Sequence, residues 1–247
     1  LLVGLIFPAL PALGKAVLCY LFALAFGAVA FYFRESLPDF SHTMACAFFL
    51  IIHLVHYSVY SIDAMRLIQS PQGALVLLGT NIYLFIEYAL WKQSQGLLFF
   101  VYLLAYLSLV IIGSGPQFTL LVSLFLTASA VYLALKKEFF PLSVCGFIFN
   151  LYLIFQTGSQ LQTSGGTVAH IAFALAHWVL FVVCNHFRPS LFINFFNSLG
   201  SYGAVSVQLS FTGSTLTKFV PALFILAQGV KVLKDSAELK GQNLFLV

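Results

Sequence analysis

Four histidines stand inside long apolar stretches of this sequence. His53 and His56 are three residues apart and His170 and His177 are seven apart, so in helices each pair shares one face. Imidazole exchanges a proton near neutral pH and also binds metals. We take these four residues as candidates for binding a substrate or a proton. Two other interpretations remain open for each: a packed histidine bonded to a neighbour, and a haem or metal ligand.

Glu87 is the one acid placed well inside an apolar stretch. It is a candidate substrate or proton acceptor, and the alternative is an interfacial acid paired with Lys92. The sequence contains no Gly-rich phosphate loop, no paired carboxylates and no His-Glu-x-x-His motif. The four cysteines form no metal-ligand or disulfide spacing. The residues therefore indicate no metal and no standard soluble enzyme mechanism.

The composition tells which elements must position these residues. Of 247 residues, 61% are hydrophobic, 17% aromatic and 7% charged, and the mean hydropathy is +1.02. Soluble domains carry about 25% charged residues. We therefore expect an all-α, polytopic integral membrane protein in a lipid bilayer. A soluble fold, a disordered chain and a nucleic-acid-binding protein are excluded.

Polar, Gly and Pro clusters divide the chain into apolar segments long enough for membrane helices, which need about 20 residues. We predict about ten short transmembrane helices, with a range of eight to ten. Their expected positions are 1–14, 16–33, 42–63, 73–91, 97–113, 117–135, 140–156, 167–186, 190–211 and 214–232.

Basic residues test this arrangement, because Lys and Arg accumulate in cytoplasmic loops. Ten helices place three on one side, Lys15, Arg66 and Lys218, and eight on the other: Arg34, Lys92, Lys136, Lys137, Arg188, Lys231, Lys234 and Lys240. The asymmetry predicts that both termini are cytoplasmic. The loops are too short to hold a soluble domain.

The two halves of the chain contain similar stretches. The segment 47–53, AFFLIIH, resembles 172–177, AFALAH, and each ends in a central histidine. This suggests a five-helix repeat, with units at 1–116 and 117–247 in one membrane domain. Because five is odd, the second unit would be inverted, as in many secondary transporters. His53 and His177 would then be equivalent and could meet near the midplane.

The segment 81–91, NIYLFIEYALW, is followed by Lys92-Gln93-Ser94 and another apolar helix. With the five-plus-five architecture, it resembles the drug/metabolite transporter superfamily. The resemblance implies a ten-helix transport fold. It transfers no binding residue to this chain.

We expect a carrier of a small molecule or ion, with a midplane site between the third, fourth, eighth and ninth helices. The alternative is a structural or electron-transfer subunit of a larger membrane complex, non-catalytic or haem-bearing. Partner membrane subunits or a homodimer fit either interpretation. We expect no cofactor, and haem is the one alternative considered.

Two remoter alternatives are an intramembrane enzyme and a retinal-type photoreceptor. Ser114 and Ser164 lie in Gly-rich breaks, but their flanks match no catalytic pattern. The order of His56, Glu87-Tyr88, Ser214 and Lys218 resembles that of a heliorhodopsin. Heliorhodopsins have seven long helices, whereas this sequence has more breaks.

Overall fold

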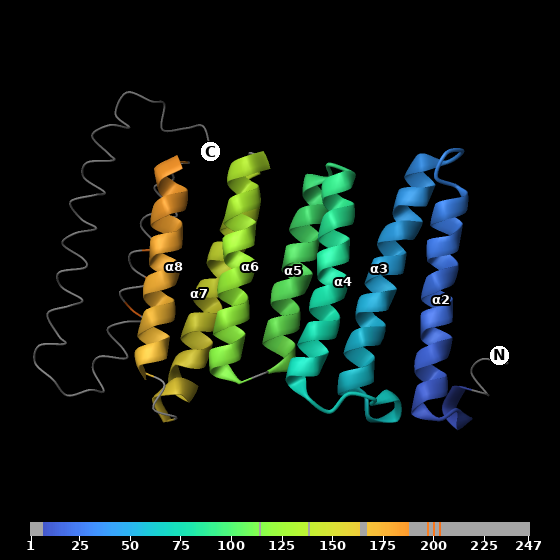
Figure 1. The fold of residues 1–247 in the computed structure, drawn as a ribbon, viewed down its shortest axis with the longest axis horizontal. Coiled ribbons are helices and arrows are strands. Elements are labelled where there is room, and N and C mark those ends of the chain that lie inside the picture. The colour runs from blue at the N-terminus through green and yellow to red at the C-terminus, as the bar shows by residue number, and fades with distance from the viewer. Residues whose placement is uncertain are drawn as a thin grey trace, which may run out of the picture. The chain divides into compact units, whose positions relative to one another are not determined.

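The computed structural model describes residues 7–113, 115–137, 139–163 and 167–187, together with 197, 200 and 203. These residues form seven α-helices and two short 3-10 turns, with no strand among them (Figure 1). The helices are α2 (Ala12–Tyr32), α3 (Pro38–Ser61), α4 (Pro71–Trp91), α5 (Gln95–Ile112), α6 (Pro116–Lys137), α7 (Phe140–Thr163) and α8 (Thr167–Phe187). The turns are η1 (Phe7–Ala9) and η2 (Asp63–Met65).

All seven helices have the length and apolar composition of membrane spans. Their 18 to 24 residues correspond to about 27–36 Å at 1.5 Å per residue, which matches a hydrocarbon core of about 30 Å. The expectation of an all-α, multi-pass membrane protein is therefore confirmed.

The structure corrects the expected number and bounds of the helices. Seven spans are found in the described residues, not about ten. The predicted helix 1–14 is wrong in its described part, since η1 is a single turn and α2 begins at Ala12. Gly14 and Lys15 do not end a helix but lie in the first turn of α2, where backbone N–H groups need no intrahelical acceptor. The predicted segments 190–211 and 214–232 lie outside the described residues, apart from three isolated positions.

Among the other bounds, the largest differences from the prediction are at the start of α3 and the end of α7. Helix α3 starts at Pro38 rather than residue 42, because proline suits the first helical position. Helix α7 continues to Thr163 rather than ending at residue 156. The buried Thr157 explains part of this extension. Its hydroxyl donates to the Leu153 carbonyl of the same helix at 2.7 Å, so this polar side chain has a partner without ending the helix.

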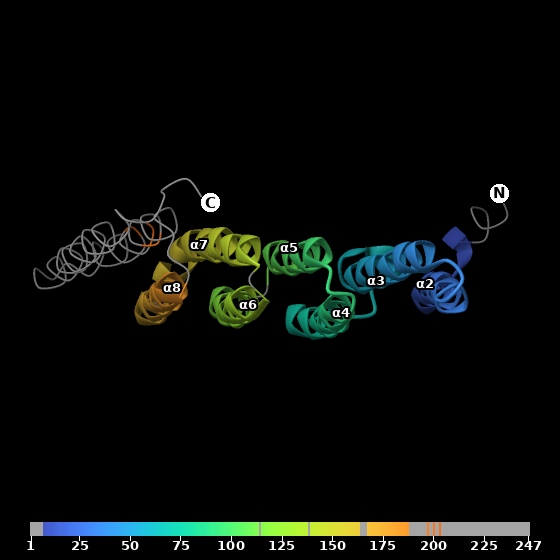
Figure 2. The same ribbon diagram turned by 90° about the horizontal axis from the view of Figure 1, so that it is seen from above.

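The chain divides into two compact units, Leu1–Ser114 and Gly115–Val247. Unit 1 contains α2 to α5, and unit 2 contains α6 to α8 among its described helices. In unit 1 each helix packs against the next. In unit 2 the three helices all contact one another, and the end-on view shows α7 lying across α6 and α8 (Figure 2). Residues 7–113 contain four α-helices rather than the five expected of a repeat unit, and the relation between the two units by a repeat stays a prediction.

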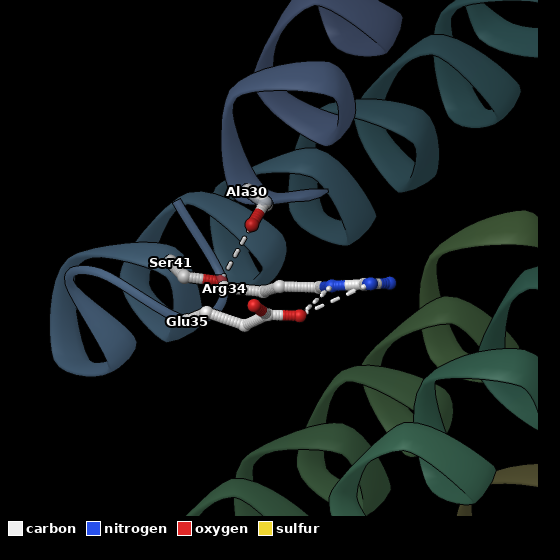
Figure 3. Close-up of polar contacts among 4 residues, drawn as sticks. All are labelled: Ala30, Arg34, Glu35 and Ser41. Atoms are coloured by element: carbon white, nitrogen blue, oxygen red, sulfur yellow. Dashed lines mark hydrogen bonds and ion pairs between the residues drawn. The ribbon is translucent and has the colours of Figure 1, made fainter. Parts of the chain in front are cut away.

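Polar side chains tie the ends of successive helices. Ser41, near the start of α3, donates to the Ala30 carbonyl at 2.6 Å and closes the α2–α3 hairpin (Figure 3). Beside it, the Arg34 guanidinium pairs with Glu35 at 3.2 Å. Ser70 and Ser94 cap α4 and α5 by accepting backbone N–H groups. These contacts fix the starts of α3, α4 and α5.

Candidate functional site

His53 lies in α3 and is 4% exposed. Its Nε2 atom is 2.9 Å from the Ser108 hydroxyl oxygen in α5. That hydroxyl donates its single hydrogen to the Leu104 carbonyl at 2.8 Å, so its oxygen accepts from the His53 N–H. Nδ1 of His53 then carries a lone pair, and it has no hydrogen-bond partner among the described residues.

His56 lies one turn further along α3 and is also buried. Its ring is tilted against Tyr20 of α2, with 5.7 Å between centroids, and contacts the backbone of Leu77 in α4. Both α3 histidines therefore face neighbouring helices of unit 1. Neither points toward the surface of the unit.

Glu87 is exposed near the end of α4. It lies ten residues from Leu77, about 15 Å along the helix axis, so the structure does not bring it together with His56. The two ion pairs in the described part of the chain are Arg34 with Glu35 and Arg66 with Asp63. Lys92 instead lies 4.4 Å over the Trp91 ring, so the expected Glu87–Lys92 pair is not formed.

Unit 2 contains a hydrogen-bonded chain through three helices. The Ser123 hydroxyl of α6 lies 2.6 Å from Asn150 Oδ1 of α7, to which it donates, and 3.0 Å from the Leu120 carbonyl of its own helix. Asn150 Nδ2 lies 2.7 Å from His177 Nδ1 of α8. Ser123 and His177 are 0% exposed and Asn150 is 2% exposed. His177 stands at the middle of α8, so this polar chain joins the three described helices of unit 2 away from their ends.

The chemistry of each atom sets the state of His177. An amide nitrogen can only donate, so Nδ1 accepts and the ring proton lies on Nε2. The ring packs on Phe147 and Phe181 at 5.6 and 4.9 Å, and Nε2 has no hydrogen-bond partner among the described residues. A second proton on Nδ1 would have to face an acceptor. Asn150 would then have to turn its oxygen to His177 and release Ser123.

His170 lies in the first half of α8 and is 2% exposed. Its Nε2 donates to the Ile154 carbonyl of α7 at 2.7 Å, since a carbonyl can only accept. The ring is thus held on the backbone of α7, which fits a packed histidine. It does not join the Ser123–Asn150–His177 chain by a described contact.

Sequence reasoning missed a second polar cluster in unit 1. His42 of α3 is 2.9 Å from the Tyr88 hydroxyl of α4, and the two rings stack at 5.6 Å. Cys46 lies 3.9 Å from the other ring nitrogen. Nearby, Asn81 donates to the Phe49 carbonyl at 3.1 Å. The spacing of His42 and Cys46 by four residues was a usable signal, because it places both on one helix face.

Metal sites can be tested against these positions. Among the described residues, no three His, Cys, Asp or Glu side chains gather closely enough to hold a metal ion. A haem would need His53 with His177 or His56 with His170. Each of these pairs takes one residue from each unit, so haem binding stays a prediction. Ser214 and Lys218, of the retinal interpretation, lie outside the described residues.

The chain matches no protein-family model, no curated protein and no solved structure. The drug/metabolite transporter resemblance therefore gains no support from them. What the fold shows is a multi-pass helical membrane protein with buried polar contacts.

Proposed function

We propose that the protein is a membrane carrier of a small molecule or ion. The observation that supports this is the Ser123–Asn150–His177 chain at the centre of three packed membrane helices. Polar groups at this depth are costly, and in membrane proteins they mark substrate or proton pathways. The midplane position agrees with the placing of carrier sites near the middle of the bilayer.

The proposal includes a mechanism for coupling. In one state Asn150 donates to His177, and in the other the amide is reversed and accepts from a doubly protonated ring. Each state satisfies a different neighbour, so proton uptake at His177 changes contacts on α6, α7 and α8 together. A two-state element of this kind can be biased by a bound solute.

The proposal also extends to the architecture. An inverted repeat, with both termini cytoplasmic, would place His53 as the counterpart of His177. The similarity of 47–53 and 172–177 and the asymmetry of the basic residues support this arrangement.

Uptake into proteoliposomes tests the carrier. Vesicles containing the full chain are incubated with a small-molecule cell extract, and their contents are measured by mass spectrometry. We expect at least one solute to accumulate above protein-free vesicles, and H177F to abolish that accumulation. H186F is the matched control, because His186 is exposed near the end of the same helix. Contents equal to those of protein-free vesicles would contradict transport.

The second candidate is a subunit of a larger membrane complex. The observation that favours it is the low burial of α2. In the 18-residue apolar window of this helix, 11% of the residues are buried. Such a face suits either lipid or a partner helix. A large assembly in detergent, or a visible absorption band of the purified protein, would support the subunit; a colourless monomer or dimer would favour the carrier.

A further inference from the structure

An apolar groove of about 600 Å³ runs along the outer side of α2 and α3 in unit 1. Leu18 and Phe22 of α2 form one wall, and Leu54 and Val55 of α3 form the other. Phe7 of η1 and Met65 of η2 close one end. Figure 1 shows both turns at the same end of these two helices.

The groove has the dimensions of a site within one leaflet. From Lys15, about one helical turn before the groove-lining Leu18, to Phe22 is seven residues, about 10 Å along α2. Half of the hydrocarbon core is about 15 Å thick. In a bilayer the apolar walls therefore face acyl chains, and the closed end lies toward the interface.

Lys15 supplies a charge at that end. The residue is 9% exposed, and its Nζ atom lies 6.0 Å from the centroid of Phe7, which forms part of the groove. Neither ion pair of the described chain includes it, since Arg66 pairs with Asp63 at 2.7 Å and Arg34 with Glu35. Because no opposite charge pairs with Lys15 among the described residues, an anion beside its ammonium would be stabilised.

The start of α2 adds to this attraction. Lys15 lies in the first turn, where the helix dipole is positive. Pro11 at the N-cap position makes no side-chain hydrogen bond to that turn. The backbone N–H groups that precede Lys15 in this turn, and the lysine itself, are two kinds of donor that a phosphate can use at one place.

We propose that this groove binds a phospholipid with an anionic headgroup. One acyl chain lies between α2 and α3, and the phosphate contacts Lys15 and the first turn of α2. Basic pockets between membrane helices bind anionic lipid headgroups in this way. The proposal is independent of the carrier function.

Native mass spectrometry of the full chain in detergent tests the proposal. The protein is titrated with dioleoyl phosphatidylglycerol or dioleoyl phosphatidylcholine, which differ in headgroup charge alone. We expect an approximately fivefold preference for the anionic lipid, as one lysine near a membrane surface provides. K15Q should remove the preference and K15R should retain it. K92Q is the matched control, because Lys92 is at another helix end and lies over Trp91.

A second measurement locates the lipid and does not require K15Q to fold. In F22W, a tryptophan stands in the groove, and phosphatidylglycerol with brominated acyl chains should quench it more than the brominated phosphatidylcholine. Equal quenching by the two lipids, or a preference unchanged in K15Q, would overturn the proposal. Protection of the tryptophan from both lipids would show that another segment or a second copy fills the groove.

Discussion

The two units hold their central histidines in opposite hydrogen-bonding states. In unit 1, the Nε2–H group of His53 donates to the Ser108 hydroxyl. Its unprotonated Nδ1 atom is buried and has no hydrogen-bond partner among the described residues. In unit 2, the unprotonated Nδ1 atom of His177 accepts from Asn150. Its Nε2–H group is buried and has no hydrogen-bond partner among the described residues. Similar sequence stretches therefore give one ring whose unbonded nitrogen is a hydrogen-bond acceptor and one whose unbonded nitrogen is a hydrogen-bond donor.

The difference follows from the partners rather than from the histidines. A serine hydroxyl can both donate and accept. The Ser108 hydroxyl donates to the Leu104 carbonyl of its own helix, so it accepts from His53. An asparagine nitrogen can only donate, and Asn150 is oriented by Ser123. One imidazole is thus fixed by one neighbour, whereas the other depends on two neighbours in two further helices.

The largest expected effect is in unit 2. Replacing Asn150 by Leu leaves the Ser123 hydroxyl and His177 Nδ1 without that partner at 0% exposure, so N150L should lower the free energy of unfolding by about 2 kcal/mol. Denaturant unfolding in mixed micelles measures it. Q156L is the matched control, because Gln156 is exposed on the same helix. If the two variants lose equal stability, the polar chain contributes nothing.

A smaller effect is expected in unit 1. S108A removes the acceptor of the His53 N–H and should cost about 1 kcal/mol, within the range of single hydrogen bonds between membrane helices. The same unfolding measurement applies, with S58A as control, because Ser58 bonds the Leu54 carbonyl of its own helix. A loss as large as that of N150L would remove the contrast between the two units.

The smallest effect is expected at Glu87. Its carboxylate is exposed and belongs to neither ion pair of the described chain. E87Q should therefore change the free energy of unfolding by less than about 0.5 kcal/mol and leave solute uptake into proteoliposomes unchanged. If E87Q reduced solute uptake while its free energy of unfolding stayed unchanged, the prediction would be wrong and Glu87 would take part in transport.

The helices were largely predictable, because the length of each apolar segment and the polar, Gly or Pro clusters between segments indicate where a membrane helix lies. Seven predicted segments from 16–33 to 167–186 correspond to α2 through α8. The misplaced bounds have local causes, since polar residues such as Thr157 bond their own helix and do not end it. Which histidines are buried was also predictable. An ionisable group inside an apolar segment is costly in contact with lipid, so it faces the neighbouring helices.

The partners of those histidines were not predictable. Ser123, Asn150 and His177 are 27 residues apart at each step, and no local spacing links them. His42 and Tyr88 meet across 46 residues because α3 and α4 are antiparallel in one register.

Composition and periodicity alone determined that this chain is a bundle of membrane helices with buried imidazoles, because transfer into lipid acts on each segment separately. Helix packing decided which nitrogen of each imidazole is bonded and left Lys15 beside an apolar groove, because hydrogen bonds and burial depend on neighbours that only the folded chain brings together.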